Sequence, residues 1–189
     1  MPEPKLLHEN LAEFAAAVAK SRGKLIVLVH PLYAEHRNLE VLPKDYLQKL
    51  DNLIKKRKGT PLLVLEEVHN VARSHERLKD PNIFYLETRP NGPEPFRHTW
   101  TELHDVLKKA GIKTILIGGS YASAHDRYGY DASIVTRYEA QRKRRPLNII
   151  SRGCVGHAYA SFIQGGYGKV RLLPELVYPD KPRWERQKA

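Results

Sequence analysis

The sequence contains a single cysteine, so it cannot form an internal disulfide, and nothing in it points to an oxidising compartment. It has no apolar run close to the ~18 residues that a membrane-spanning helix needs. Its first residues, MPEPKLLHENLAEF, include acidic side chains and lack the hydrophobic core of a secretion signal. We therefore expect no disulfide framework and no membrane span, and we expect a cytoplasmic protein.

Negative charge is also scarce. The 189 residues include 32 Lys and Arg but only 21 Asp and Glu, which gives a formal net charge of +11. Such an excess favours anionic partners, for example nucleic acid, nucleotides or acidic metabolites. The basic residues concentrate in KKRK (55–58), in QRKRR (141–145) and in the last ten residues. Solvated surfaces and helix ends explain such runs equally well, so a nucleic-acid partner is one of two open interpretations.

Two patterns alternate along the chain, namely continuous apolar runs and amphipathic stretches. The runs predict strands at 24–31, 60–69, 82–90, 112–120, 146–151 and 169–179. Apolar residues at helical spacing predict helices at 9–20, 43–59, 98–111 and 155–166. This alternation indicates a three-layer α/β sandwich with a mostly parallel, Rossmann-like sheet. We expect one α/β domain over residues 1–179, an insertion at about 121–146 and a basic C-terminal tail at 180–189.

Polar residues follow most of the predicted strands. In a parallel α/β sheet, sites form at the carboxyl ends of the strands, which all lie at one edge. The residues at these positions are His30, Glu66, Glu67, His69, Glu87, Arg89, Gly118, Gly119, Ser120, Tyr121, Arg152, Gly153, Cys154 and His157. We expect several of them to meet in one site, the alternative being an ordinary polar edge.

Cys154 has the strongest local argument for chemistry. It lies where a predicted strand gives way to a predicted helix, and unpaired amides at a helix N-terminus favour the thiolate form. Gly153 and Gly156 would let backbone donors approach a developing oxyanion, and Arg152 adds positive charge. His157 would share a helical face with Cys154 and could act as a base. The alternative is a buried thiol that packs as a small hydrophobic side chain.

A family resemblance adds to this argument. The segments LKKAGIKTILIGGS and GCVGHAYASFIQGGYGKVRLLPELVYP resemble parts of the isochorismatase-like cysteine hydrolases, and the matching residues are Gly118, Cys154, Val155, Gly166 and Tyr167. The resemblance covers the C-terminal half and implies an α/β sandwich in which Cys154 is the nucleophile. The family pairs that cysteine with an aspartate at the end of the first strand and with a lysine from the middle of the chain. Here His30 replaces the aspartate, and no lysine in NIFYLETRPNGPEPFRHTW matches.

Three other segments carry weaker candidates. The backbone amides of Gly118, Gly119 and Ser120 would suit an anion, but their spacing matches neither the dinucleotide fingerprint nor the P-loop. The tyrosine-rich segment 121–131 would either line a pocket or pack on the surface. The histidines and glutamates of HPLYAEH and EEVH are metal-ligand types without a His-Glu-x-x-His pattern. We expect no metal and no cofactor.

Two functions are therefore open. The first is a protein that binds a small, anionic ligand at the carboxyl strand edge and that, as an enzyme, would be a hydrolase with Cys154 as nucleophile and His157 or His30 as general base. Its ligand-binding residues would be Glu66, His69, Gly118, Gly119, Ser120, Tyr121, Arg152, Gly153 and Gly156. The second is a non-catalytic nucleic-acid-binding or regulatory protein that uses its basic insertion and tail. The oligomeric state stays open, a homo-oligomer included.

Overall fold

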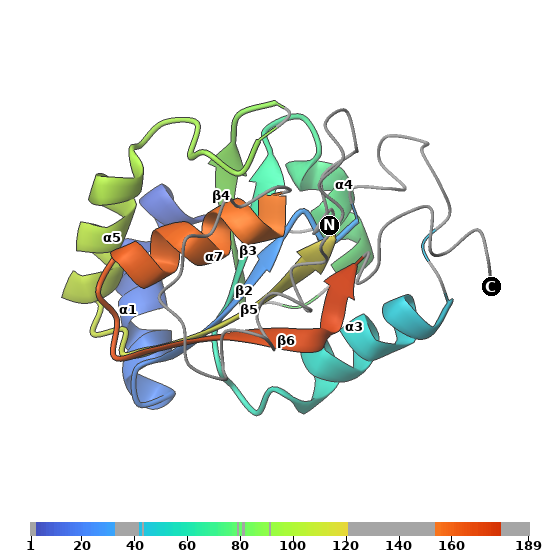
Figure 1. Cartoon of the computed structure of the whole chain (residues 1–189), viewed down its shortest axis with the longest axis horizontal. Coiled ribbons are helices and arrows are strands. Elements are labelled where there is room, and N and C mark those ends of the chain that lie inside the picture. Colours follow the sequence, from blue (N-terminus) through green and yellow to red (C-terminus); the bar gives the residue numbers. More distant parts are fainter. Residues whose placement is uncertain are drawn as a thin grey trace, which may run out of the picture.

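The computed structural model describes residues 3–32, 42, 44–78, 80, 82–90, 92–120 and 154–178. Six strands form one parallel sheet in the order β1–β4–β3–β2–β5–β6 (Figure 1). The strands are β1 (Lys5–Leu6), β2 (Lys24–Val29), β3 (Leu62–Glu67), β4 (Ile83–Thr88), β5 (Thr114–Ser120) and β6 (Lys169–Tyr178). The helices are η1 (Leu7–Glu9), α1 (Leu11–Lys20), α3 (Lys44–Lys56), α4 (Val71–Leu78), α5 (Trp100–Lys109) and α7 (Cys154–Gln164).

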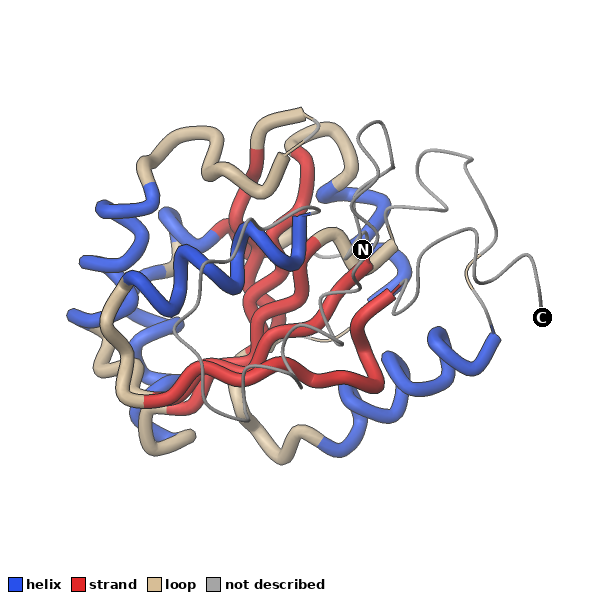
Figure 2. Tube along the Cα trace, in the orientation of Figure 1, coloured by secondary structure: helices blue, strands red, loops and turns tan. Residues whose placement is uncertain are grey.

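Helices cover both faces of the sheet, which gives the three layers expected from the sequence (Figure 2). One hydrophobic core joins α1, α5 and α7 to the sheet, and Phe14, Leu107 and Phe162 are buried in it. The second core joins α3 and α4 to the opposite face through Tyr46 and Leu50, among others. The central strands are apolar on both sides because each face of the sheet has a helical layer to pack against.

The structure confirms the predicted strands and helices that fall within the described residues, with ends shifted by a few residues. The helix predicted at 155–166 begins at Cys154 itself. In the helix predicted at 9–20, Phe14 and Val18 enter the core while Leu11 stays 43% exposed. The strand predicted at 146–151, the insertion at 121–146 and the tail at 180–189 lie outside the described residues.

Three elements were not predicted from the sequence: strand β1, the short helix η1 and helix α4. Strand β1 has only two residues, which is too short for an alternation pattern to show. Helix α4 buries Val71, Ser74 and Leu78, so a serine occupies the middle of its inner face and interrupts the apolar spacing. The hydroxyl of Ser74 is buried because it donates a hydrogen bond to Glu66.

No helix in the described part of the chain is both long enough and apolar enough to cross a membrane.

Candidate functional site

A row of buried polar side chains lies at the carboxyl ends of four adjacent strands. Its members are Ser120 of β5, His30 directly after β2, Glu66 and Glu67 of β3, and Thr88 of β4, and none of them has measurable exposure. Sheet pairing brings them together, since Val29 is in register with both Leu65 and Gly119, and Glu67 with Thr88. Burial of polar side chains costs folding free energy, and such groups cluster at functional sites. We therefore take the carboxyl edge as the candidate site.

His30 occupies the centre of the row in an unusual backbone conformation. Its φ angle is +43°, in the left-handed region that non-glycine residues seldom adopt. Its amide donates to the Leu65 carbonyl at 2.8 Å, and its own carbonyl accepts a hydrogen bond from the Ser120 hydroxyl. The ring Nε2 lies 3.0 Å from the Thr88 hydroxyl oxygen. These bonds hold the imidazole across the end of β3, and strain maintained in this way is common at functional sites.

Glu66 is the first of two adjacent buried carboxyls, and it points toward α4. It accepts hydrogen bonds from the Ser74 hydroxyl at 2.6 Å and from the Glu67 amide at 3.0 Å. Burial nevertheless raises the pKa of Glu66 to about 7, because these two bonds compensate only part of the desolvation and the Glu67 charge adds to it. A carboxyl with such a pKa can both accept and donate a proton near neutral pH.

Glu67 is on the other face of the sheet from Glu66, because successive residues of a strand alternate between faces. One of its oxygens accepts a hydrogen bond from the Asn70 side-chain amide at 3.3 Å and lies 3.2 Å from Nε2 of the half-exposed His69. This is the face covered by α7. Glu67 is therefore the strand-end carboxyl on the same side of the sheet as Cys154.

Cys154 is the first residue of α7 and is only 5% exposed. Burial raises the pKa of its thiol to about 12, and the negative charges of Glu94, Glu67 and Glu66 raise it further in that order. The thiolate expected from the helix N-terminus is thus corrected, because desolvation and three carboxylates outweigh the favourable backbone. The structure does bring the thiol into the field of the strand-end carboxylates, and Cys154 remains a protonated thiol that needs a base to react.

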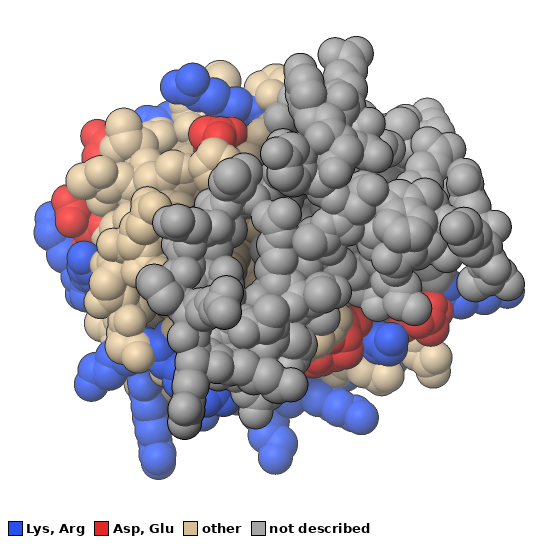
Figure 3. Space-filling view, in the orientation of Figure 1, with Lys and Arg blue, Asp and Glu red and all other residues tan. Residues whose placement is uncertain are grey.

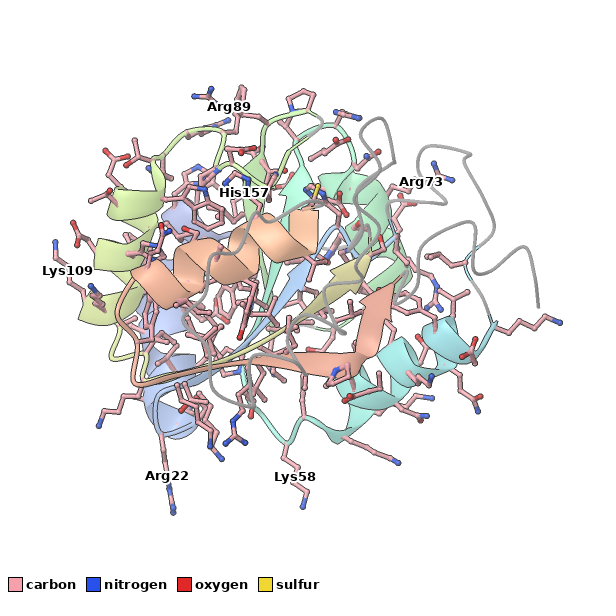
Figure 4. The ribbon with its side chains drawn as sticks, viewed as in Figure 1. Arg22, Lys58, Arg73, Arg89, Lys109 and His157 are labelled. Atoms are coloured by element: carbon pink, nitrogen blue, oxygen red, sulfur yellow. The ribbon has the colours of Figure 1, made fainter. Side chains whose placement is uncertain are left out.

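His157 and Glu94 form the exposed rim of this site. Nδ1 of His157 lies 3.4 Å from a carboxylate oxygen of Glu94, and its ring stacks on Trp100 with centroids 6.4 Å apart. Both side chains are close to half exposed. His157 projects from α7 toward the loop that carries Glu94 (Figure 4). In the described part of the chain no hydrogen bond joins His157 to Cys154, so the shared helical face does not make His157 the partner of the thiol.

The two glycines expected to bind an anion have a packing role instead. They lie inside β5, between β2 and β6, where the backbone pairs with its neighbours. A Cβ atom on Gly119 would lie 2.0 Å from the Val29 carbonyl oxygen, and one on Gly118 would lie 2.9 Å from Cβ of Leu176. Ser120 also has a structural role, since its hydroxyl donates a hydrogen bond to the His30 carbonyl.

The other expected residues are placed as follows. Gly156 is buried in the first turn of α7, while Tyr121, Arg152 and Gly153 lie outside the described residues. His69 is at the site and contacts Glu67. Among the described residues, no three side chains of His, Cys, Asp or Glu are grouped closely enough to hold a metal ion.

Thr88 and Glu94 belong to the site but were not candidates from the sequence. Thr88 lies near the end of the strand predicted at 82–90 and is the last residue of β4, so its position was a usable signal, although an uncharged threonine is not an obvious candidate. Glu94 lies in the loop between β4 and α5, and that loop returns to the site because Arg89 and Phe96 form backbone bonds with Glu94 and Glu87. No local sequence pattern predicts that this loop folds back to the site.

The fold and the edge together define a class: a three-layer α/β protein whose carboxyl sheet edge gathers a thiol, three imidazoles and three carboxyl groups. Comparison with known proteins adds no name to this class. No protein-family model matches the sequence, and no curated protein matches it significantly.

Proposed function

We propose that the protein is a hydrolase of the isochorismatase-like kind, in which Cys154 attacks the carbonyl carbon of a small amide or ester. The observation that carries the proposal is the position of Cys154, which begins α7 within the field of Glu94, Glu67 and Glu66. A thiol at a helix N-terminus, close to a carboxylate that can accept its proton, has the components of nucleophilic catalysis.

Glu67 has the best claim to be the general base. It is on the α7 side of the sheet, and its charge acts on the thiol more strongly than that of Glu66. The charge of Glu94 acts more strongly still, but Glu94 is half exposed at the rim and pairs with His157. In the resemblance this role belongs to an aspartate at the end of the first strand, where this chain has His30. The ring Nε2 of His30 is engaged with Thr88, so His30 serves better as the group that orders the edge.

The reaction would proceed in two stages. First, the Cys154 proton passes to Glu67 while sulfur bonds to the carbonyl carbon, and the proton then leaves with the amine or alcohol. Second, water hydrolyses the thioester and releases the carboxylic acid. Backbone amides in the first turn of α7 would stabilise the oxyanion, and His157 and Glu94 would contact the leaving group at the rim.

The charge of the site refines the expected ligand. The net charge of the chain favours an anion, but the described lining near Cys154 is acidic. Carboxylates repel an anionic substrate and accept hydrogen bonds from an amide N–H, so the proposal favours a neutral carboxamide. We place the activity in the cytoplasm as part of the proposal, since a single cysteine gives no sign of an oxidising compartment.

The test uses p-nitrophenyl acetate and a series of small primary carboxamides with the full-length protein. We expect an acetyl adduct on Cys154 by mass spectrometry, and peptide mapping distinguishes it from acetylation of lysine amines. Cys154→Ala should abolish adduct and turnover, and Glu67→Gln should lower the turnover by about 10²–10⁴-fold, as expected for loss of a general base. Glu76→Gln, on the exposed side of α4, is the matched control. Hydrolysis that is unchanged in Cys154→Ala would refute the proposal.

A further inference from the structure

The amino-terminal edge of the sheet, opposite the candidate site, is strongly basic. Four segments meet there: 20–24 between α1 and β2, 55–60 between α3 and β3, 108–114 between α5 and β5, and 165–171 between α7 and β6. Every charged side chain in these segments is a Lys or an Arg. Arg57 is buried. The other side chains are exposed, and they are Lys20, Arg22, Lys24, Lys55, Lys56, Lys58, Lys108, Lys109, Lys113, Lys169 and Arg171. We call these exposed residues the basic edge.

The backbone joins these segments, although they are far apart in the sequence. The amides of Lys113 and Thr114 donate to the Gly23 carbonyl at 2.8 and 3.1 Å, and the Lys169 amide donates to the Lys113 carbonyl at 3.1 Å. The segment 55–60 joins the same row through the bond from the Ile26 amide to the Pro61 carbonyl. Because neighbouring strands are ~4.8 Å apart, the four strands β3, β2, β5 and β6 space these cations over roughly 15 Å.

Helix stability accounts for only part of this charge. Cations in the last turn of a helix interact favourably with its dipole, which explains Lys20, Lys55, Lys56, Lys108 and Lys109. The residues in turns and at strand starts, such as Lys24 and Lys169, have no such role. Arg22 and Lys58 have φ angles of +57° and +49°, a conformation that costs a non-glycine residue free energy. Both side chains point away from the body of the molecule (Figure 4).

We propose that the basic edge binds double-stranded nucleic acid through its phosphates, without reading the base sequence. Figure 3 shows Lys and Arg gathered along the lower border of the molecule, where the strands begin. The labelled cations of this edge, Arg22, Lys58 and Lys109, diverge into solvent instead of converging on one point, so they fit a row of spaced phosphates better than a single small anion.

The residues between the cations favour a duplex over a single strand or a membrane. Single-stranded nucleic acid is bound by stacking of its bases on exposed aromatic rings. The one aromatic residue in the four segments is Tyr167, whose hydroxyl bonds to His104 and whose ring packs against Phe162. The large hydrophobic side chains exposed in the described residues, Leu11 and Phe96, are not in these segments, so the edge offers nothing to insert into lipid.

The test is fluorescence anisotropy with a short DNA duplex of random sequence, between about 50 and 200 mM salt. The test variant is Lys24→Gln/Lys113→Gln/Lys169→Gln, and the matched control is Lys44→Gln/Arg73→Gln/Arg89→Gln, which removes the same charge from exposed positions elsewhere. We expect binding by the test variant to weaken at least about tenfold at low salt, and its log–log salt slope to fall by about 2 to 3, or ~0.9 per lost phosphate contact. The control should keep both values close to those of the unmodified protein.

A second variant, Lys55→Gln/Lys56→Gln/Lys58→Gln, repeats the test at the other end of the row, and far-UV circular dichroism checks that each variant is folded. Equal losses in test and control variants would refute the basic edge as the binding surface. Absence of duplex binding at about 50 mM salt, tighter binding to single-stranded DNA, or binding only to phosphatidylserine vesicles would each refute the proposal as well. Hydrolase activity is not needed for any of these results.

Discussion

A buried thiol beside carboxylates keeps its proton at neutral pH, and this one property governs the chemistry of Cys154. The helix N-terminus lowers the energy of a thiolate, but burial and the charges of Glu94, Glu67 and Glu66 raise it by more. The residue is therefore poorly reactive at rest and depends on proton transfer at the moment of attack. In the proposed hydrolase, such a thiol would discriminate against adventitious electrophiles, because only a substrate placed beside both thiol and base would meet a thiolate.

This balance predicts the alkylation behaviour of Cys154. Glu94 is the carboxylate that raises the thiol pKa most, and its side chain is 41% exposed, so Glu94→Gln should leave the fold intact. We expect iodoacetamide to label the folded protein slowly at pH 8, and Glu94→Gln to be labelled severalfold faster because the thiolate fraction rises with the lower pKa. Mass spectrometry after timed quenching measures both rates. Equal rates in the two proteins would show that burial alone controls the thiol, and Glu76→Gln, on the exposed side of α4, serves as the control.

Among the elements, α5 shows how local sequence positions the rim of the site. Thr99 caps the helix in a reciprocal capping box, in which its hydroxyl accepts from the Glu102 amide at 3.2 Å and the Glu102 carboxylate accepts from the Thr99 amide at 2.6 Å. The loop that carries Glu94 ends at this cap. The start of α5 therefore fixes where the loop ends, beside His157, whose ring stacks on Trp100.

The cap predicts a measurable loss of stability. Thr99→Ala removes the hydroxyl that accepts the Glu102 amide, and replacement of such a cap costs about 1 kcal/mol. We expect the urea midpoint to fall accordingly, with the slope of the transition unchanged. Thr101→Ala is the control, since Thr101 is exposed in the first turn and is not the cap. A loss of similar size in the control would attribute the effect to threonine content instead of capping.

The elements also show which parts of the molecule the sequence could predict. Buried runs such as 24–31 and 112–120 identify strands because both of their faces are apolar, and Thr99 and Gly111 mark the ends of a helix through cap and turn chemistry. Helix α4 was missed because its inner face holds Ser74, a residue whose burial depends on Glu66 from another element. The thiol pKa was predicted in the wrong direction for the same reason, since it is raised by burial in the core and by carboxylates from β3 and from a loop.

At the scale of the whole molecule, charge is separated between the two edges of the sheet. The described carboxyl edge holds Glu66, Glu67 and Glu94, whereas the amino edge carries the Lys and Arg side chains of the basic edge. A formal net charge of +11 describes neither edge by itself, so the anionic ligand expected from it stays a prediction. The hydrolase proposal and the nucleic-acid proposal therefore concern opposite ends of the sheet, and each can be refuted without the other.

The stability of the whole molecule also depends on pH through one buried carboxyl, that of Glu66. Burial raises the pKa of Glu66 from 4.5 to about 7, so between these values the folded protein keeps a proton that the unfolded chain releases. The contribution of Glu66 to stability is complete below about pH 4.5 and is lost as the pH rises through 7, which amounts to about 3 kcal/mol. Glu66→Gln stays uncharged throughout, so its advantage over the unmodified protein should grow by about that amount between pH 4.5 and pH 8. Urea unfolding at both pH values measures the difference, with Glu76→Gln as the control, and identical pH dependence of all three proteins would mean that Glu66 is ionised in the folded state.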